Sequence, residues 1–204
     1  MIELNQTKMD STTFKNTITS VVPGNLIACI THQPDFYRLA ESYLQGAKML
    51  VRHLGEDGLY RDVGILPICF MYRHFLELTF KQIVWDGRRL LGEDARIQEL
   101  CSGGKAHELL PLWNKIEDIM KSVFPDESLP NETLLMREVV NWFHEADGRS
   151  FNFRYPFDHQ QQACLEGIRH INLTTLVSAM EVSDFFLSGV AGAICEYLSH
   201  QQSV

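Results

Sequence analysis

Three charged side chains on one predicted helix have a spacing that suits polar chemistry. In the stretch YRHFLELTFK (72–81), Arg73 and Glu77 are four residues apart, and Lys81 follows Glu77 at the same interval. Residues four apart share a face of an α-helix, so the three charges form a ladder. Two interpretations stay open: a solvated surface ladder, or a buried network in which every charge has a partner, because an unpaired buried charge is costly.

A buried network would need partners from predicted helix ends and loops, which a helical bundle can bring together. We expect His107, Asp147 and Asp158 to complete one polar network with Arg73 and Glu77, and Glu145, Arg149 and Arg154 are further candidates. Charged hydrogen bonds between such groups would fix the helix ends relative to one another.

The stretch SFNFRYPFD (150–158) holds four aromatic residues and one arginine. Its aromatics alternate, so an extended backbone would point Phe151, Phe153, Tyr155 and Phe157 to one side, where they would close the end of the bundle. Pro156 favours such a backbone at the residue before it. Arg154 would then face the other way. It either bridges to an acid such as Glu77 or Asp147, or orients a phosphate group.

The elements that position these residues are predicted to be helices. Apolar periodicity and helix start signals predict helices over 34–55 and 66–91, from His107, over 131–148, and from Asn172 onward, with a loop over 56–64. We therefore expect an all-α bundle of about five helices over 34–204. Residues 1–33 would form a short N-terminal strap or arm of the same single domain, 1–204.

Composition limits the classes of function. The 204 residues carry a net charge of −8 and five cysteines without a CxxC pair, which argues against a basic nucleic-acid coat and gives no metal site. Neither a signal peptide nor an 18-residue charge-free apolar run is present, so we expect a cytoplasmic protein with no membrane span. No cofactor is expected, since phosphate-loop and nucleophile-elbow motifs are missing.

Three segments together resemble a known group of proteins. YRHFLEL, HELLPLW and FHEADGRSFNFRYP are similar, over roughly 65–160, to the YRHxxEL, HDLxxLW and DxxSxxFRYPxD motifs of uncharacterised bacterial and phage helical proteins. That group resembles the HEPN superfamily, whose helical bundles occur in toxins, antiphage systems and RNA-processing enzymes. The resemblance implies an HEPN-like homodimer in a bacterial or phage conflict setting, with RNA as a substrate and a protein partner or antitoxin.

The resemblance also implies a chemistry. Active HEPN ribonucleases carry an Arg-x4–6-His motif, in which the arginine holds the scissile phosphate and the histidine helps proton transfer. The RNA 2′-hydroxyl then attacks its own phosphate without a metal ion. Two pairs in this sequence match that spacing, Arg154 with His159 and Arg137 with His144.

A second hypothesis is a non-catalytic helical module for dimerisation or partner binding. Here Arg73, Glu77, His107 and Arg154 would form a structural lock, meaning a set of polar contacts that only holds the fold. Small residues such as Gly189 and Gly192 in the last helix would let another helix approach closely. Whether the protein is an enzyme stays open between these two hypotheses.

Overall fold

The computed structural model describes residues 35–103, 105–125 and 131–201, apart from 57–59. The predicted strap over 1–33 lies outside these residues, and the contacts set apart a compact unit that begins at Asp35. Within the described residues the unit is made of helices: α2 (Phe36–Glu56), α3 (Arg61–Leu90), α4 (Ile97–Cys101), α5 (Leu109–Val123), α6 (Glu132–Asp147) and α7 (Leu173–Gln201). The predicted all-α bundle is confirmed, and the five-residue α4 is an element that the sequence analysis missed.

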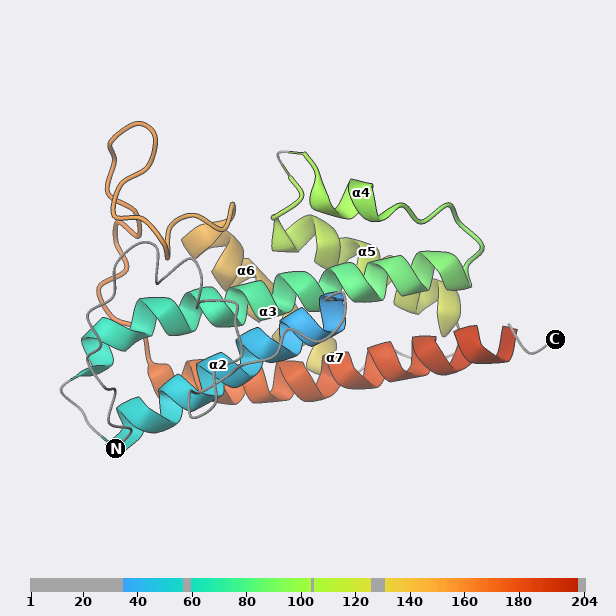
Figure 1. Cartoon of the computed structure of the whole chain (residues 1–204), viewed down its shortest axis with the longest axis horizontal. Coiled ribbons are helices and arrows are strands. Elements are labelled where there is room, and N and C mark those ends of the chain that lie inside the picture. The colour runs from blue at the N-terminus through green and yellow to red at the C-terminus, as the bar shows by residue number, and fades with distance from the viewer. Residues whose placement is uncertain (1–34, 57–59, 104, 126–130, 202–204) are drawn as a thin grey trace, which may run out of the picture. The chain divides into compact units, whose positions relative to one another are not determined.

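The long helix α3 is the centre of the bundle. It packs against α2, α5 and α7, while α6 packs against α5 and α7 (Figure 1). A helix surrounded on three sides buries residues around most of its circumference, and α3 buries fourteen of its thirty residues. This explains why apolar residues flank the charge ladder on both sides.

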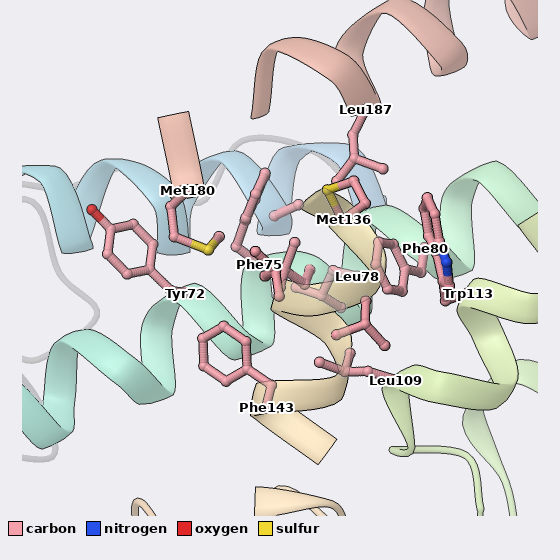
Figure 2. Packing of buried hydrophobic residues seen from close by; sticks show 14 of the residues in the cluster. Tyr72, Phe75, Leu78, Phe80, Leu109, Trp113, Met136, Phe143, Met180 and Leu187 are labelled. Atoms are coloured by element: carbon pink, nitrogen blue, oxygen red, sulfur yellow. The ribbon is translucent and has the colours of Figure 1, made fainter. Parts of the chain in front are cut away.

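Large apolar side chains from all six described helices form the core. The rings of Phe80 on α3 and Trp113 on α5 lie 5.7 Å apart between centroids, and Trp113 also contacts Phe186 of α7, with 6.3 Å between the ring centroids. Figure 2 shows α3, α5, α6 and α7 meeting there through Tyr72, Phe75, Leu78, Phe80, Leu109, Trp113, Met136, Phe143, Met180 and Leu187. This packing fixes the positions of the helix ends that carry the polar residues.

The start of α3 differs from the prediction. The segment 56–64 was expected to be a loop, but α3 begins at Arg61, so Pro67 lies inside the helix instead of in its first turn. The error has a packing cause: Gly64 is fully buried, and a Cβ atom there would lie 2.1 Å from Cδ1 of Leu54 on α2. Glycine therefore serves the close approach of two helices here, which local sequence does not distinguish from a turn.

The predicted helix caps have mixed outcomes. Asn172 accepts a hydrogen bond from the backbone N–H of Thr175 at 3.0 Å, as expected of an N-cap. Asn131 occupies the N-cap position of α6 but makes no capping hydrogen bond through its side chain. Gly148 follows α6, as predicted, but keeps a helical backbone (φ −54°) instead of the left-handed one.

Two of the described helices, α3 and α7, are long and apolar enough to cross a membrane by length and composition alone. A core helix of a soluble protein passes the same test. Of the apolar 18-residue stretch in α3, 56% is buried inside the bundle, whereas only 33% of the corresponding stretch in α7 is buried. The apolar character of α3 thus belongs to the core, whereas α7 exposes much of its length, and the expected absence of a membrane span stays a prediction.

We predict that the core is sensitive to truncation where α3 is enclosed. Replacing the fully buried Leu76 by alanine should lower the free energy of unfolding by about 2–5 kcal/mol, because the side chain leaves a cavity. The matched change Leu134→Ala removes a leucine of α6 that is 69% exposed, and should stay within about 0.5 kcal/mol. Urea unfolding followed by circular dichroism measures both, and equal effects would contradict this core.

Candidate functional site

A fully buried arginine near the middle of α3 organises the junction with the start of α5 and the end of α6. The guanidinium of Arg73 donates from Nε to the carbonyl of Asp147 at 2.7 Å and from Nη1 to Glu77 Oε2 at 3.2 Å. Its Nη2 donates to the carbonyls of His107, at 2.6 Å, and Gly148, at 3.2 Å. Burial lowers the pKa of Arg73, and the negative charges of Asp147 and Glu77 oppose that effect.

Glu77 is the second member of this network and is only 1% exposed. Its Oε1 accepts a hydrogen bond from Lys81 Nζ at 2.7 Å and lies 2.8 Å from His107 Nδ1, while His74 Nδ1 is 3.9 Å from Oε2. Burial alone would raise the pKa of this carboxyl. The neighbouring His74, Lys81 and His107 outweigh burial and lower the pKa from 4.5 to about 2. The charge ladder of α3 is therefore internal.

Asp147, the last residue of α6, connects the network to the aromatic loop. Its Oδ2 lies 3.6 Å from Arg73 Nε, and the carboxylate is fully buried. Its Oδ1 accepts the backbone N–H groups of Phe151 and Asn152, the latter at 2.8 Å. Asn152 in turn donates to the carbonyl of Ala146 at 2.7 Å. One carboxylate thus holds both the end of α6 and the start of the loop.

The loop itself does not run extended, so the predicted alternation of its aromatics is wrong. The N–H groups of Arg154 and Tyr155 both bond to the carbonyl of Phe151, which makes a turn. Phe153 alone is buried in the core, while Tyr155 is 49% exposed. Ser150 has a left-handed backbone (φ 59°) just before the turn, a conformation that local sequence does not signal for serine.

Arg154 lies on this turn and pairs with no carboxylate among the described residues. It donates to the carbonyl of Ser150, and its Cζ lies 5.6 Å from the ring centroid of Phe70 on α3 and 5.5 Å from that of Tyr155. Of the two alternatives left open for Arg154, the bridge to Glu77 or Asp147 is therefore wrong. Its positive charge still acts on Arg73, whose pKa it helps to lower, so the two guanidinium groups are near neighbours.

His159 lies at the other end of the same aromatic group. Its ring is 5.2 Å from that of Phe151, which stacks on Tyr155 at 4.5 Å. The side chains of Arg154 and His159 are therefore connected through two stacked rings. Both residues are exposed, and apart from the hydrogen bond of Arg154 to Ser150 neither side chain hydrogen-bonds to another described residue.

The other predicted pair is used differently. On α6, Nη2 of Arg137 forms an ion pair with Glu117 of α5, and this pair occupies the guanidinium. His144 is partly buried, and its Nδ1 is buried without a hydrogen-bond partner within the described part of the chain. No contact joins Arg137 to His144 there, so the seven-residue spacing does not produce a visible Arg–His site.

Asp158, which was predicted to join the polar network, organises its own loop instead. Its Oδ1 accepts the backbone N–H groups of Gln160 and Gln162, at 2.8 and 2.9 Å. With Glu145 and Trp142 it lines a separate cavity of about 450 Å³. The prediction is wrong because nearby backbone donors satisfy this carboxylate first. Arg149 is exposed and makes no side-chain contact with the network in the part of the chain described.

The network includes one residue that we left out of the predicted set. Lys81 is 3% exposed and pairs with Glu77, and the ladder spacing could have identified it. Ser150, which accepts from Arg154, carried no usable signal because its role depends on its backbone conformation. Over the described ranges, no group of three or more His, Cys, Asp or Glu residues could hold a metal ion.

Comparisons with protein-family models, with curated proteins and with solved structures found no match. The resemblance to HEPN proteins therefore stays an expectation that rests on the sequence motifs alone. What the chain can do must be argued from its own geometry.

We predict that Glu77 controls the stability of the network and its response to acid. Because its folded pKa, about 2, lies below the ordinary 4.5, the ionised carboxylate stabilises the fold at neutral pH. This stabilisation, on the order of 3 kcal/mol, is lost as the pH falls from 4.5 towards 2. Glu77→Gln should lose about 3 kcal/mol at pH 7 and show a correspondingly weaker decline in acid, measured by urea unfolding at several pH values.

The matched control is Glu93→Gln. Glu93 pairs with Arg88 at 3.1 Å but is 52% exposed, so its loss should cost no more than about 1 kcal/mol at any pH. A Glu77→Gln variant as stable as this control would contradict a paired, ionised carboxylate in the core.

Proposed function

We propose that this protein is an HEPN-like, metal-independent endoribonuclease of a bacterial or phage conflict system, acting in the cytoplasm as a toxin or defence effector. Arg154 would hold the scissile phosphate, and His159 would help transfer a proton. The conflict setting and the cytoplasmic location rest on the sequence resemblance, and the site rests on the geometry of the aromatic loop.

One observation carries the assignment to this loop. Of the two Arg–His pairs with the expected spacing, only Arg154 and His159 are both exposed and free of a carboxylate partner among the described residues. Arg137 is neutralised by Glu117. An arginine that binds a phosphate must be free of internal acids, because a buried or exposed carboxylate competes for the same donors.

The surroundings of the pair support an RNA strand as the ligand. Tyr155, whose ring centroid lies 5.5 Å from Cζ of Arg154, is 49% exposed, and Phe157, two residues later in the same loop, is 60% exposed. Exposed aromatic rings next to arginine are the usual means by which proteins stack unpaired bases while binding the adjacent phosphates. The net charge of −8 weakens long-range attraction of RNA, so the proposed contact is local and should be sensitive to salt.

The test is cleavage of total tRNA and of an unstructured RNA in the presence of EDTA. The wild type should produce fragments with 2′,3′-cyclic phosphate ends. Arg154→Ala should reduce the rate by about 100-fold or more, because the phosphate loses its charged donor. Arg137→Ala discriminates between the two pairs and should retain cleavage if the proposed pair is correct.

Arg96→Ala serves as the neutral control, since Arg96 is 65% exposed and pairs only with Asp94. All variants are checked for an unchanged melting temperature. Absence of cleavage by a folded wild type would overturn the proposal, and loss of cleavage in Arg137→Ala alone would move the site to α6.

A second candidate function is a helical dimerisation module, favoured by the exposed side of α7. Phe185 is 82% exposed, and a Cβ atom added at Gly189 or Gly192 would meet no atom of the described residues within 4 Å. Exposed apolar and small residues on one side of a long helix suit close packing against a second helix. The homodimer implied by the resemblance would use this surface, and a protein partner or antitoxin would compete for it.

If the protein is a dimerisation module, one negative charge introduced on the exposed side of α7 should disrupt the dimer. In sedimentation velocity, the wild type should be a dimer at micromolar concentration and Phe185→Glu a folded monomer, because the carboxylate would be buried at the interface. Leu134→Glu, at a site of α6 that is 69% exposed, should leave the dimer intact. A monomeric wild type would rule out the dimer, and the cleavage assay tests the enzyme independently.

A further inference from the structure

His107 stands out because its ring is held by a buried acid and yet reaches solvent. Its Nδ1 lies 2.8 Å from Glu77 Oε1, while its side chain is 54% exposed and that of Glu77 is 1% exposed. A buried carboxylate behind an exposed imidazole is an arrangement that many enzymes use to orient a histidine for proton transfer. None of the predicted Arg–His pairs includes this residue.

The contact with Glu77 decides which nitrogen of His107 carries the hydrogen. The carboxylate of Glu77 is ionised and can only accept hydrogen bonds. In the neutral ring of His107, Nδ1 must therefore carry the hydrogen and donate it to Glu77 Oε1. The free lone pair then lies on Nε2, which has no hydrogen bond to any residue that the structure describes. His107 thus presents a base on the side of the ring away from the network.

The network also fixes the position of this ring. Arg73 Nη2 binds the backbone carbonyl of His107 at 2.6 Å, and Lys81 holds the same oxygen of Glu77 that contacts the ring. Both the backbone and the Nδ1 of His107 are therefore restrained by buried charges. Such restraint keeps a catalytic group oriented at little entropic cost when a substrate binds.

The base and the phosphate-binding arginine belong to the same corner of the bundle. The nitrogen of Arg73 that binds the His107 carbonyl also binds the Gly148 carbonyl, so the two backbones meet there. Two residues after Gly148, the carbonyl of Ser150 accepts from Arg154. His107 therefore lies beside the segment that presents Arg154, although the two are far apart in sequence.

We propose that His107 is a catalytic general base of the RNA cleavage, that Glu77 is its positioning residue, and that Arg154 holds the phosphate next to it. The inference rests on the proposed function. Nε2 of His107 takes the proton of the RNA 2′-hydroxyl, O2′ bonds to phosphorus and the P–O5′ bond breaks. A protonated His159 gives its proton to O5′, so the products are a 2′,3′-cyclic phosphate and a 5′-hydroxyl.

The experiment compares cleavage of the same unstructured RNA by the wild type, His107→Ala and His107→Gln in EDTA. Both variants should lose about 100-fold or more in rate, because neither has a base at this position. Glu77 keeps Lys81 and Arg73 in both, and glutamine also keeps a donor for Glu77, so we expect both to fold. Added imidazole should restore part of the activity of His107→Ala, since the vacated site is half exposed.

The matched control is His200→Ala. His200 faces Glu196 at 4.0 Å on α7, as His107 faces Glu77, but both side chains of this pair are more than 70% exposed. This variant should cleave at the wild-type rate. In ¹⁵N NMR of the wild type, the neutral ring of His107 should carry its hydrogen on Nδ1, a readout independent of cleavage.

The outcomes separate the two proposals. If the wild type cleaves RNA and His107→Ala cleaves equally fast, the role of His107 is overturned and the proposed function stands. The same role is overturned if activity falls only in step with melting temperature without rescue by imidazole, or if the hydrogen is on Nε2. If the folded wild type does not cleave RNA, the proposed function fails, and the assignment of His107 to this reaction fails with it.

Discussion

The buried guanidinium of Arg73 is the constraint on which the junction of α3, α5 and α6 depends. It is completely excluded from solvent, and three of its nitrogens make four hydrogen bonds to three backbone carbonyls and one carboxylate. Only arginine offers several donors in one rigid plane, so lysine could not replace it at this junction. Since a lone buried cation would be strongly unfavourable, the acids and carbonyls around it must all be in place.

Part of this site could be predicted from the sequence because its signals are local. The i, i+4 spacing of Arg73, Glu77 and Lys81 places them on one face whatever the rest of the chain does. His107 and Asp147 could be chosen because they lie at predicted helix ends, which bundles bring together. Whether the ladder was buried could not be predicted, because that depends on α3 being enclosed by three other helices.

Other features depend on contacts that the pattern of residue types does not show. The residue pattern of 151–157 fits an extended strand, yet the hydrogen bonds of Asp147 to the loop N–H groups favour a turn there. Gly64 looks like a loop residue in sequence but allows α2 and α3 to touch. Asp158 has the right charge for the network, but its own loop satisfies it. In each case the outcome was decided by a backbone donor in a nearby loop or by the close approach of two helices.

The region around Arg73 and Arg154 combines a buried, hydrogen-bonded interior with an exposed surface whose arginine has no acidic partner among the described residues. Buried acids and carbonyls satisfy Arg73, whereas Arg154 is exposed, with only one carbonyl and two aromatic rings as neighbours. The two guanidinium groups are near each other but experience different environments. Arg73 is buried and cannot contact a ligand. Arg154 has no carboxylate among the described residues that would compete with a ligand for its donors.

The shared nitrogen of Arg73 also has a consequence for how the chain folds and unfolds. The carbonyls of His107 and Gly148 that it binds are 34 and 75 residues away along the chain. The first contact needs the start of α5 docked on α3, and the second needs the end of α6 docked there. A state with only one of the two in place would bury the charge of Arg73 without all of its partners. We therefore expect these three segments to come apart together in a single cooperative step, with no stable intermediate in which one of them has left.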